Sequence, residues 1–140
     1  MVGSRARRLV CIVDDDASFC RALTSLLSSH GCRVEAYSCA EGFVQALEAG
    51  RLSCAALLLD VHLGTTSGFA LYDRLTASKH AMPTIFMTGR DDAVTRERVA
   101  RLGATAYLVK PFEDAALIQA IDLALAPRRP SRRSTRGRSS

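Results

Sequence analysis

A run of uncharged residues at 54–59 ends directly in the carboxylate of Asp60, and this run limits the possible folds more than any other stretch. An uninterrupted apolar run of this length is typical of a strand buried on both faces, as in the middle of a parallel sheet. In open α/β sheets, ligands bind outside the carboxyl ends of the strands. The sequence therefore places Asp60 where a ligand would bind.

Apolar stretches that resemble this one alternate with helical patterns along the chain. The further predicted strands lie at 9–13, 32–37, 84–87 and 105–109. Apolar residues at helical spacing indicate helices near 19–30, 40–47, 69–75, 92–102 and 117–125. Strands that alternate with helices predict a doubly wound five-stranded parallel sheet of the α/β class. The apolar stripe of the helix at 92–102 is weak, so we expect this helix to dock loosely.

Local signals predict where several helices begin. Asp16 is expected to cap the helix that follows the first strand. Ser38 and Glu41 have the spacing of a capping box, which predicts the start of the second helix. Residues 64–68 are rich in glycine, threonine and serine, and they are predicted to form a loop.

The composition is that of an ordinary globular domain. The 140 residues are enough for one domain with a core, and the hydrophobic and charged fractions are 48% and 24%. The apolar run at 9–13 is too short for a membrane span or a signal peptide. We therefore expect no membrane segment and a cytoplasmic location.

The cysteine pattern suggests neither a disulfide framework nor a zinc site. Five is an odd number, and the spacing is not that of zinc ligands. We expect all five to be reduced residues of the core. They are Cys11, Cys20, Cys32, Cys39 and Cys54.

The net charge of +5 comes from the two ends of the chain. Nine arginines lie within 1–8 and 127–140, which leaves 10 basic residues against 14 acidic ones between these segments. We predict a flexible basic N-terminus at 1–8, a folded domain at 9–126 and a disordered arginine- and serine-rich tail at 127–140. Because the basic charge is not on a folded face, we expect no sequence-specific binding of nucleic acid.

Four of the predicted strands end in polar side chains: Asp14 and Asp15, Asp60, Thr88, and Lys110. The carboxyl ends of parallel strands meet at one edge of a sheet, so these groups should converge. Three carboxylates at close range repel one another unless a cation lies between them, and hard oxygen ligands suit Mg²⁺. A lysine and a hydroxyl beside this ion predict a phosphoryl-transfer site with an aspartate acceptor.

On these motifs the chain resembles the response regulator receiver domains of two-component signalling, the CheY-like superfamily. The resemblance covers about 9–125 and implies the flavodoxin-like (βα)5 fold with strand order 2-1-3-4-5. The matching pieces are Ile12-Val13-Asp14-Asp15-Asp16, Leu58-Leu59-Asp60, Ser67-Gly68, Met87-Thr88-Gly89, Gly103-Ala104 and Tyr107-Leu108-Val109-Lys110-Pro111-Phe112.

The resemblance assigns a role to each residue of the acidic cluster. It implies that Asp60 is phosphorylated, and that Asp14, Asp15 and Asp60 bind Mg²⁺. The backbone carbonyl of His62 would be a further ligand of this ion.

The resemblance also implies how the phosphoryl group is bound and sensed. Thr88 and Lys110 would bind the phosphoryl oxygens, and Tyr107 would be the aromatic switch residue. The peptide bond before Pro111 is commonly cis in the family, which fits the low cis penalty of proline.

We therefore expect a response regulator that accepts a phosphoryl group from a sensor histidine kinase or a phosphotransfer protein and catalyses its own dephosphorylation. The last two helices and the last strand would form the partner-binding face, and a homodimer is one use of it. No effector sequence follows residue 125, so we expect a stand-alone receiver. The alternatives are the receiver part of a DNA-binding transcriptional regulator and a non-phosphorylated adaptor.

Overall fold

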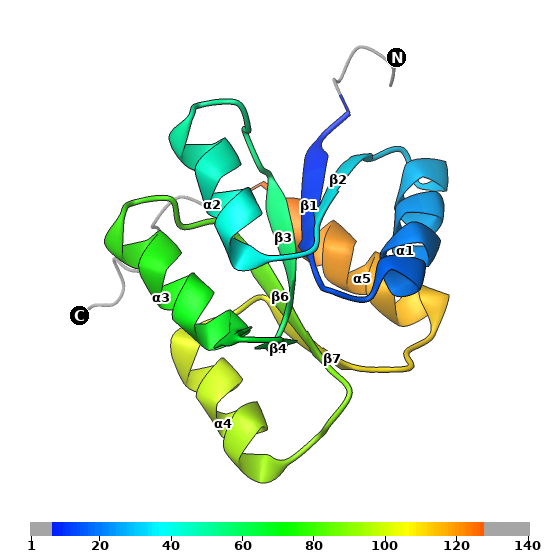
Figure 1. The fold of residues 1–140 in the computed structure, drawn as a ribbon. Coiled ribbons are helices and arrows are strands. Elements are labelled where there is room, and N and C mark those ends of the chain that lie inside the picture. The colour runs from blue at the N-terminus through cyan, green and yellow to red at the C-terminus, as the bar shows by residue number, and fades with distance from the viewer. Residues whose placement is uncertain (1–6, 128–140) are drawn as a thin grey trace, which may run out of the picture.

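The computed structural model describes residues 7–127 and contains, within them, five parallel strands in one sheet (Figure 1). The strands are β1 (Leu9–Val13), β2 (Arg33–Tyr37), β3 (Ala56–Asp60), β6 (Thr84–Thr88) and β7 (Ala106–Val109). Their order is β2-β1-β3-β6-β7. The predicted order 2-1-3-4-5 is confirmed, with β6 and β7 as the fourth and fifth strands.

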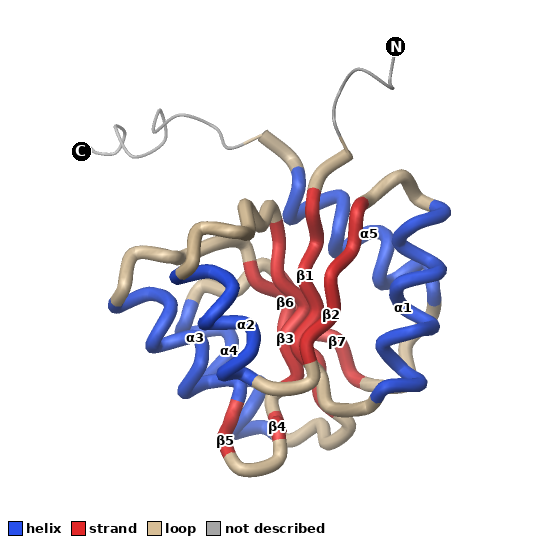
Figure 2. Tube along the Cα trace, turned by 45° about the horizontal axis from the view of Figure 1, so that its top comes forward, coloured by secondary structure: helices blue, strands red, loops and turns tan. Residues whose placement is uncertain are grey.

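Helices cover both faces of this sheet, as Figure 2 shows. They are α1 (Ala17–Ser29), α2 (Ala40–Glu48), α3 (Gly68–Ala77), α4 (Ala93–Leu102) and α5 (Asp114–Leu125). α1 and α5 lie on one face, and α2, α3 and α4 lie on the other. The doubly wound architecture predicted from the alternating pattern is therefore confirmed.

The core consists of two apolar clusters, one on each face of the sheet. Leu57 and Leu59 pack in the cluster under α2 and α3, and Leu58 packs in the cluster under α1 and α5. Successive side chains of a strand point to opposite faces, so a strand with helices on both sides needs apolar residues at every position. This explains the continuous apolar run before Asp60.

The predicted N-terminal cap of α1 is confirmed, whereas the predicted capping box of α2 is not formed. The Asp16 side chain accepts a hydrogen bond of 3.0 Å from the Phe19 backbone N–H, which confirms it as the cap of α1. The capping box predicted at Ser38 and Glu41 is wrong. The N-cap of α2 is Cys39, one residue after Ser38, and this extended residue makes no side-chain cap hydrogen bond.

The segment predicted as a loop at 64–68 contributes to a small hairpin. β4 (His62–Leu63) and β5 (Thr66–Ser67) pair antiparallel, with His62 opposite Ser67. Gly64, at φ 78°, stands at the turn between them. Strands of two residues are too short to show an alternating pattern of apolar residues. The sequence therefore showed only the turn-forming residues, which predicted a loop.

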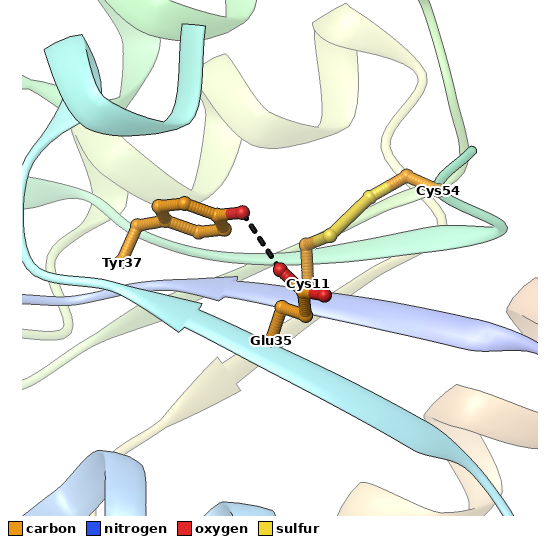
Figure 3. The surroundings of a disulfide bond; sticks show 4 residues. All are labelled: Cys11, Glu35, Tyr37 and Cys54. Atoms are coloured by element: carbon orange, nitrogen blue, oxygen red, sulfur yellow. Dashed lines mark hydrogen bonds between the residues drawn. A yellow bond between two sulfur atoms is a disulfide. The ribbon is translucent and has the colours of Figure 1, made fainter. Parts of the chain in front are cut away.

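The expectation of five reduced core cysteines is wrong for three of them. Cys11 and Cys54, which are 43 positions apart in the sequence, form a disulfide (Figure 3), and their Cα atoms lie 6.3 Å apart. They meet because β1 and β3 are neighbouring strands and Cys54 lies just before β3. Cys39 is exposed, whereas Cys20 and Cys32 are free and buried as expected.

The two arginine-rich ends lie almost entirely outside the described residues. The predictions of a flexible N-terminus at 1–8 and a disordered tail at 127–140 therefore stay predictions. Within 7–127, none of the helices has the combination of length and apolar character that crossing a membrane requires.

The start of α3 approaches β3 so closely that it leaves no space for a side chain. The Gly68 N–H donates to the Val61 carbonyl at 2.7 Å. A Cβ on Gly68 would overlap the Asp60 carbonyl group, with its carbonyl carbon at 3.1 Å, and would lie 3.2 Å from Leu59 Cγ. The glycine of the Ser67-Gly68 motif thus permits a backbone contact directly behind Asp60.

We expect Gly68→Ala to destabilise the fold by about 1–3 kcal/mol, because the overlap is with backbone that cannot move aside. Gly42→Ala is a matched control, because its Cβ would meet only Cys39 Sγ and Tyr37 Cδ2, at 3.7 and 3.8 Å. Gly42 is the third residue of α2, and this change should stabilise the fold by about 0.5–1 kcal/mol. Urea unfolding measures both. Equal stability of the two variants would contradict the close approach.

Candidate functional site

Three carboxylates meet at the carboxyl edge of the sheet. Asp14 and Asp15 follow β1, and Asp60 ends β3, the strand paired with β1. Each offers an oxygen within 4.8 Å of the others. Asp14 and Asp60 are only 1% and 6% exposed, whereas Asp15 is exposed. The structure thus brings together the acids that the strand ends predicted to converge.

Lys110 reaches into this cluster from the end of β7. Its Nζ lies 2.7 Å from Asp14 Oδ2 and 3.6 Å from Asp60 Oδ1. It also lies 4.3 Å from the centre of the Phe19 ring. Burial opposes its charge, but the hydrogen bond and charge of Asp14 prevail and raise the pKa of Lys110 above its ordinary value. The lysine therefore stays cationic beside the acids. The peptide bond that follows it, before Pro111, is cis as the family resemblance implies.

Asp60 is the acid whose ionisation the site disfavours. Burial, followed by the charge of Asp14, raises the pKa of Asp60 from 3.8 to about 6. The charge of Lys110 and a backbone hydrogen bond from His62 act in the opposite direction. Removing water and adding a like charge both favour the protonated acid, and a single ammonium only partly offsets them.

This set of side chains fits a divalent cation. One ammonium faces three carboxylates, so the cluster keeps an excess of negative charge that a cation would neutralise. Its donors are all hard oxygen atoms, and the exposed side of Asp15 is open to solvent, as Mg²⁺ with its retained waters requires. Asp14, Asp15 and Asp60 are the residues that would hold it. The part of the His62 carbonyl as a further ligand stays a prediction.

Thr88 lies at the same edge, but its hydroxyl bonds to the following loop. Thr88 is fully buried at the end of β6, one residue beyond the partner of Asp60. Its hydroxyl donates to the Arg90 carbonyl and accepts from the Arg90 N–H, each at 3.0 Å. In this structure, therefore, the hydroxyl proton is engaged by the loop.

Tyr107 is not part of the acidic cluster. Its hydroxyl donates to Asp91 Oδ1 at 3.1 Å, and Asp91 is also hydrogen-bonded by Arg96 of α4.

The sequence pattern did not predict a role for Asp91 or Arg96. Nothing in the residue pattern joins Asp91 to a tyrosine 16 positions later, because the contact depends on β6 and β7 being neighbours.

The raised pKa of Asp60 predicts how stability depends on pH when no divalent ion is present. Between about pH 4 and 6 the folded protein binds more protons than the unfolded chain, so stability falls as pH rises through this range. Asp60→Asn removes the buried charge and keeps the shape of the side chain. We expect it to stabilise the fold at about pH 8 by on the order of 2 kcal/mol, with a gain that shrinks towards pH 4.

Urea unfolding in a chelator, repeated across this pH range, measures the effect. Asp73→Asn on the exposed side of α3 is a control for the loss of one surface carboxylate. A stability gain at pH 8 that is no larger for Asp60→Asn than for Asp73→Asn would contradict the burial argument.

Comparisons with known proteins agree with this architecture. A family model described as the response regulator receiver domain matches residues 10–122. The response regulator protein TmoT of Ectopseudomonas mendocina is 35% identical over 117 residues, which are 84% of this chain and 52% of TmoT. The transcriptional regulatory protein FixJ of Bradyrhizobium diazoefficiens is 33% identical over 125 residues, which are 89% of this chain and 60% of FixJ. The chain thus spans little more than half the length of these relatives.

Solved structures show the same fold. A response regulator receiver protein from Burkholderia phymatum is 36% identical and superposes with a TM-score of 0.77, over 89% of this chain and 99% of that protein. The response regulator StyR is 37% identical with a TM-score of 0.75, over 86% of this chain and 60% of StyR. The family model covers most of the chain, and the sheet order and the strand-end acids are those that the resemblance implied. The chain therefore belongs to the response regulator receiver domain family of two-component systems.

Proposed function

We propose that this domain is a phosphoacceptor switch in the cytoplasm, in which Asp60 takes a phosphoryl group from the phosphohistidine of a sensor histidine kinase or a phosphotransfer protein. The observation that carries the proposal is the meeting of Asp14, Asp15 and Asp60 within 4.8 Å, with the Lys110 ammonium beside them. A structural role alone does not account for several acids held this close together at a partly buried edge.

In the proposed reaction a carboxylate oxygen of Asp60 attacks the phosphorus atom of the phosphohistidine. The phosphorus–nitrogen bond breaks, its electron pair stays on the imidazole nitrogen, and an acyl phosphate forms on Asp60. Lys110 Nζ, 3.6 Å from Asp60 Oδ1, is close enough to pair with an oxygen of the new phosphoryl group. Mg²⁺ bound by Asp14 and Asp15 would neutralise charge on the carboxylates and the phosphoryl oxygens.

Loss of the phosphoryl group belongs to the same proposal. Water attacks the phosphorus atom and gives up a proton to solvent, the bond to the Asp60 oxygen breaks with its electron pair on that oxygen, inorganic phosphate leaves, and the free carboxylate is restored. Asp15 is exposed at the rim of the cluster, which supports access of water from this side. The domain would thereby catalyse its own dephosphorylation.

The output of the switch is proposed to be the face made by α4, β7 and α5. Thr88 would donate to the new phosphoryl group, and Tyr107 would turn inward. Val94 of α4 and Leu123 of α5 are 77% and 62% exposed, which is unusual for large apolar residues. Leu123 also lines an apolar groove with Leu108 and Ala120. These features support the binding of a partner protein or of a second copy at this face.

The relatives favour a second candidate for the output. TmoT and FixJ are longer than this chain, and FixJ is named as a transcriptional regulatory protein. In that case the 140 residues are the receiver part of a DNA-binding regulator. In the stand-alone case they act through protein contacts alone. The mass of the native protein in its own cells distinguishes the two.

Incubation with acetyl phosphate and Mg²⁺ should add one phosphoryl group to the unmutated protein and none to Asp60→Asn, because the amide cannot form the acyl phosphate. Intact-mass spectrometry measures the transfer. Asp73→Asn is the matched control and should be labelled like the unmutated protein. A chelator should abolish labelling, since uncompensated charge then opposes the incoming phosphate.

Undiminished labelling of Asp60→Asn would show that another residue is the acceptor. If the unmutated protein takes up no phosphoryl group and binds no Mg²⁺ in a titration, the adaptor alternative replaces the proposal, because an adaptor has no reason to bind the ion.

Lys110→Ala should still accept a phosphoryl group on Asp60 but fail to transmit the change, because no ammonium then joins the phosphoryl group to β7. Amide NMR spectra before and after phosphorylation report the response of α4, β7 and α5. The chain's other lysine, the exposed Lys79, supplies the control variant Lys79→Ala. Spectral changes in phosphorylated Lys110→Ala that match those of the control would disprove this role.

A further inference from the structure

A chain of hydrogen bonds connects the two proposed switch residues through the loop between β6 and α4. The Thr88 hydroxyl is bonded to the backbone N–H and carbonyl of Arg90, each at 3.0 Å. The next residue, Asp91, accepts the hydrogen bond of the Tyr107 hydroxyl at 3.1 Å. One short loop therefore contacts Thr88 at the sheet edge and Tyr107 on the neighbouring strand.

The Asp91 carboxylate is held in place from a second side. Arg96 Nη2 lies 2.6 Å from Asp91 Oδ1 and 2.5 Å from Asp91 Oδ2. The next residue in the chain, Asp92, caps α4 by accepting from the Thr95 N–H at 2.8 Å. Asp91 thus links the N-terminal turn of α4 to the tip of the Tyr107 side chain.

We infer that Asp91 is a positioning residue for the switch: in the unphosphorylated protein it holds the half-buried Tyr107 side chain in an outward position, with its hydroxyl at the loop between β6 and α4, and Arg96 fixes Asp91 in the orientation that this requires. The inference rests on the proposed function, in which Tyr107 moves once Asp60 is phosphorylated. The proposed function alone does not identify what keeps the tyrosine outside before that event.

The Thr88 hydroxyl has a single proton, and this explains how phosphorylation weakens the contact between Asp91 and Tyr107. Phosphoryl oxygens only accept hydrogen bonds, so Thr88 can bond to a phosphoryl group on Asp60 only by donating that proton. The proton is at present donated to the Arg90 carbonyl. A Thr88 bond to the phosphoryl group and its bond to the Arg90 carbonyl therefore exclude each other, so the loop loses one of its two hydrogen bonds to Thr88, one residue before Asp91.

The charge on Asp91 determines how strongly its hydrogen bond favours the outward position of Tyr107. A hydroxyl donating to a carboxylate makes a stronger bond than one between neutral groups. Burial first, and then the hydrogen bond to Asp91, raise the pKa of the Tyr107 phenol above its ordinary value. The Asp91 side chain is 35% exposed, which weakens the bond compared with a buried one. We expect its loss to shift the ratio of inward to outward Tyr107 on the order of tenfold.

Tyrosine side-chain NMR observes the contact directly. The chain has three tyrosines and no tryptophan, so protein with labelled tyrosine gives few signals, which Tyr→Phe variants assign. In the unphosphorylated protein, Asp91→Ala should move the Tyr107 signal, and Asp91→Asn should move it less because an oxygen acceptor remains. Glu97→Ala removes an exposed acid from α4, the helix that follows Asp91, and should leave the signal in place.

An equilibrium measurement tests the link to the phosphorylation site. Beryllofluoride with Mg²⁺ serves as the phosphoryl analogue. Asp91→Ala should raise its affinity by about the factor by which it shifts Tyr107, because coupling between sites is reciprocal. In a Tyr107→Phe background the same substitution should have no further effect, since no hydroxyl remains to be held. A role of Asp91 in the stability of α4 alone would persist in that background.

An unmoved Tyr107 signal in Asp91→Ala, or an equal gain of affinity in the Tyr107→Phe background, would overturn the inference. The two failures are distinguishable. If the unmutated protein binds no beryllofluoride and takes up no phosphoryl group, the proposed function fails, while the tyrosine signal of the unphosphorylated variants still reports whether Asp91 holds the ring.

Discussion

The repulsion among the carboxylates at the sheet edge is the constraint on which the rest of this structure depends. Asp14 and Asp60 are almost completely buried, and the pKa of about 6 for Asp60 shows the free-energy cost of holding its charge there. The Lys110 ammonium offsets only part of this cost. The favourable free energy of burying β1, β3 and β6 between two helical layers offsets the rest of this cost. The most apolar strands of the sheet thus carry or adjoin its most unfavourable charges.

Backbone geometry connects the core to the site. In parallel strands the register that aligns the apolar residues also aligns the residues that follow them, and Val13 pairs with Leu59. Asp14 and Asp60 therefore come together without any attraction between them. Gly68 adds a second constraint, because its lack of a side chain lets α3 begin against the Asp60 carbonyl. The position of Asp60 is set by packing, and its chemistry by the charges around it.

The features that follow from the spacing of apolar residues along the chain were predictable. The features that depend on side-chain contacts between distant segments were not. The apolar runs and polar strand ends predicted the sheet and the acidic cluster, because both follow from the direction of parallel strands. The Cys11–Cys54 pair was missed because two of five cysteines can pair in many ways and the spacing favours none. Asp91 was missed because it reaches Tyr107 from a loop, where sequence pattern does not specify the orientation of side chains.

The weak apolar stripe of α4 in the sequence corresponds to a helix that buries little apolar surface in the structure. Val99 is the single buried residue among the ten that form this helix. The Arg98 guanidinium lies 4.3 Å from the centre of the Phe69 ring, and Arg96 bonds to Asp91, so polar and cation–π contacts hold much of the helix. A helix with so little apolar area in the core is displaced at low cost. In the proposed switch, contacts as small as those of Asp91 would therefore be sufficient to bias the position of α4, whereas they would have little influence on a helix anchored as α5 is, with Leu117 and Ile121 completely buried.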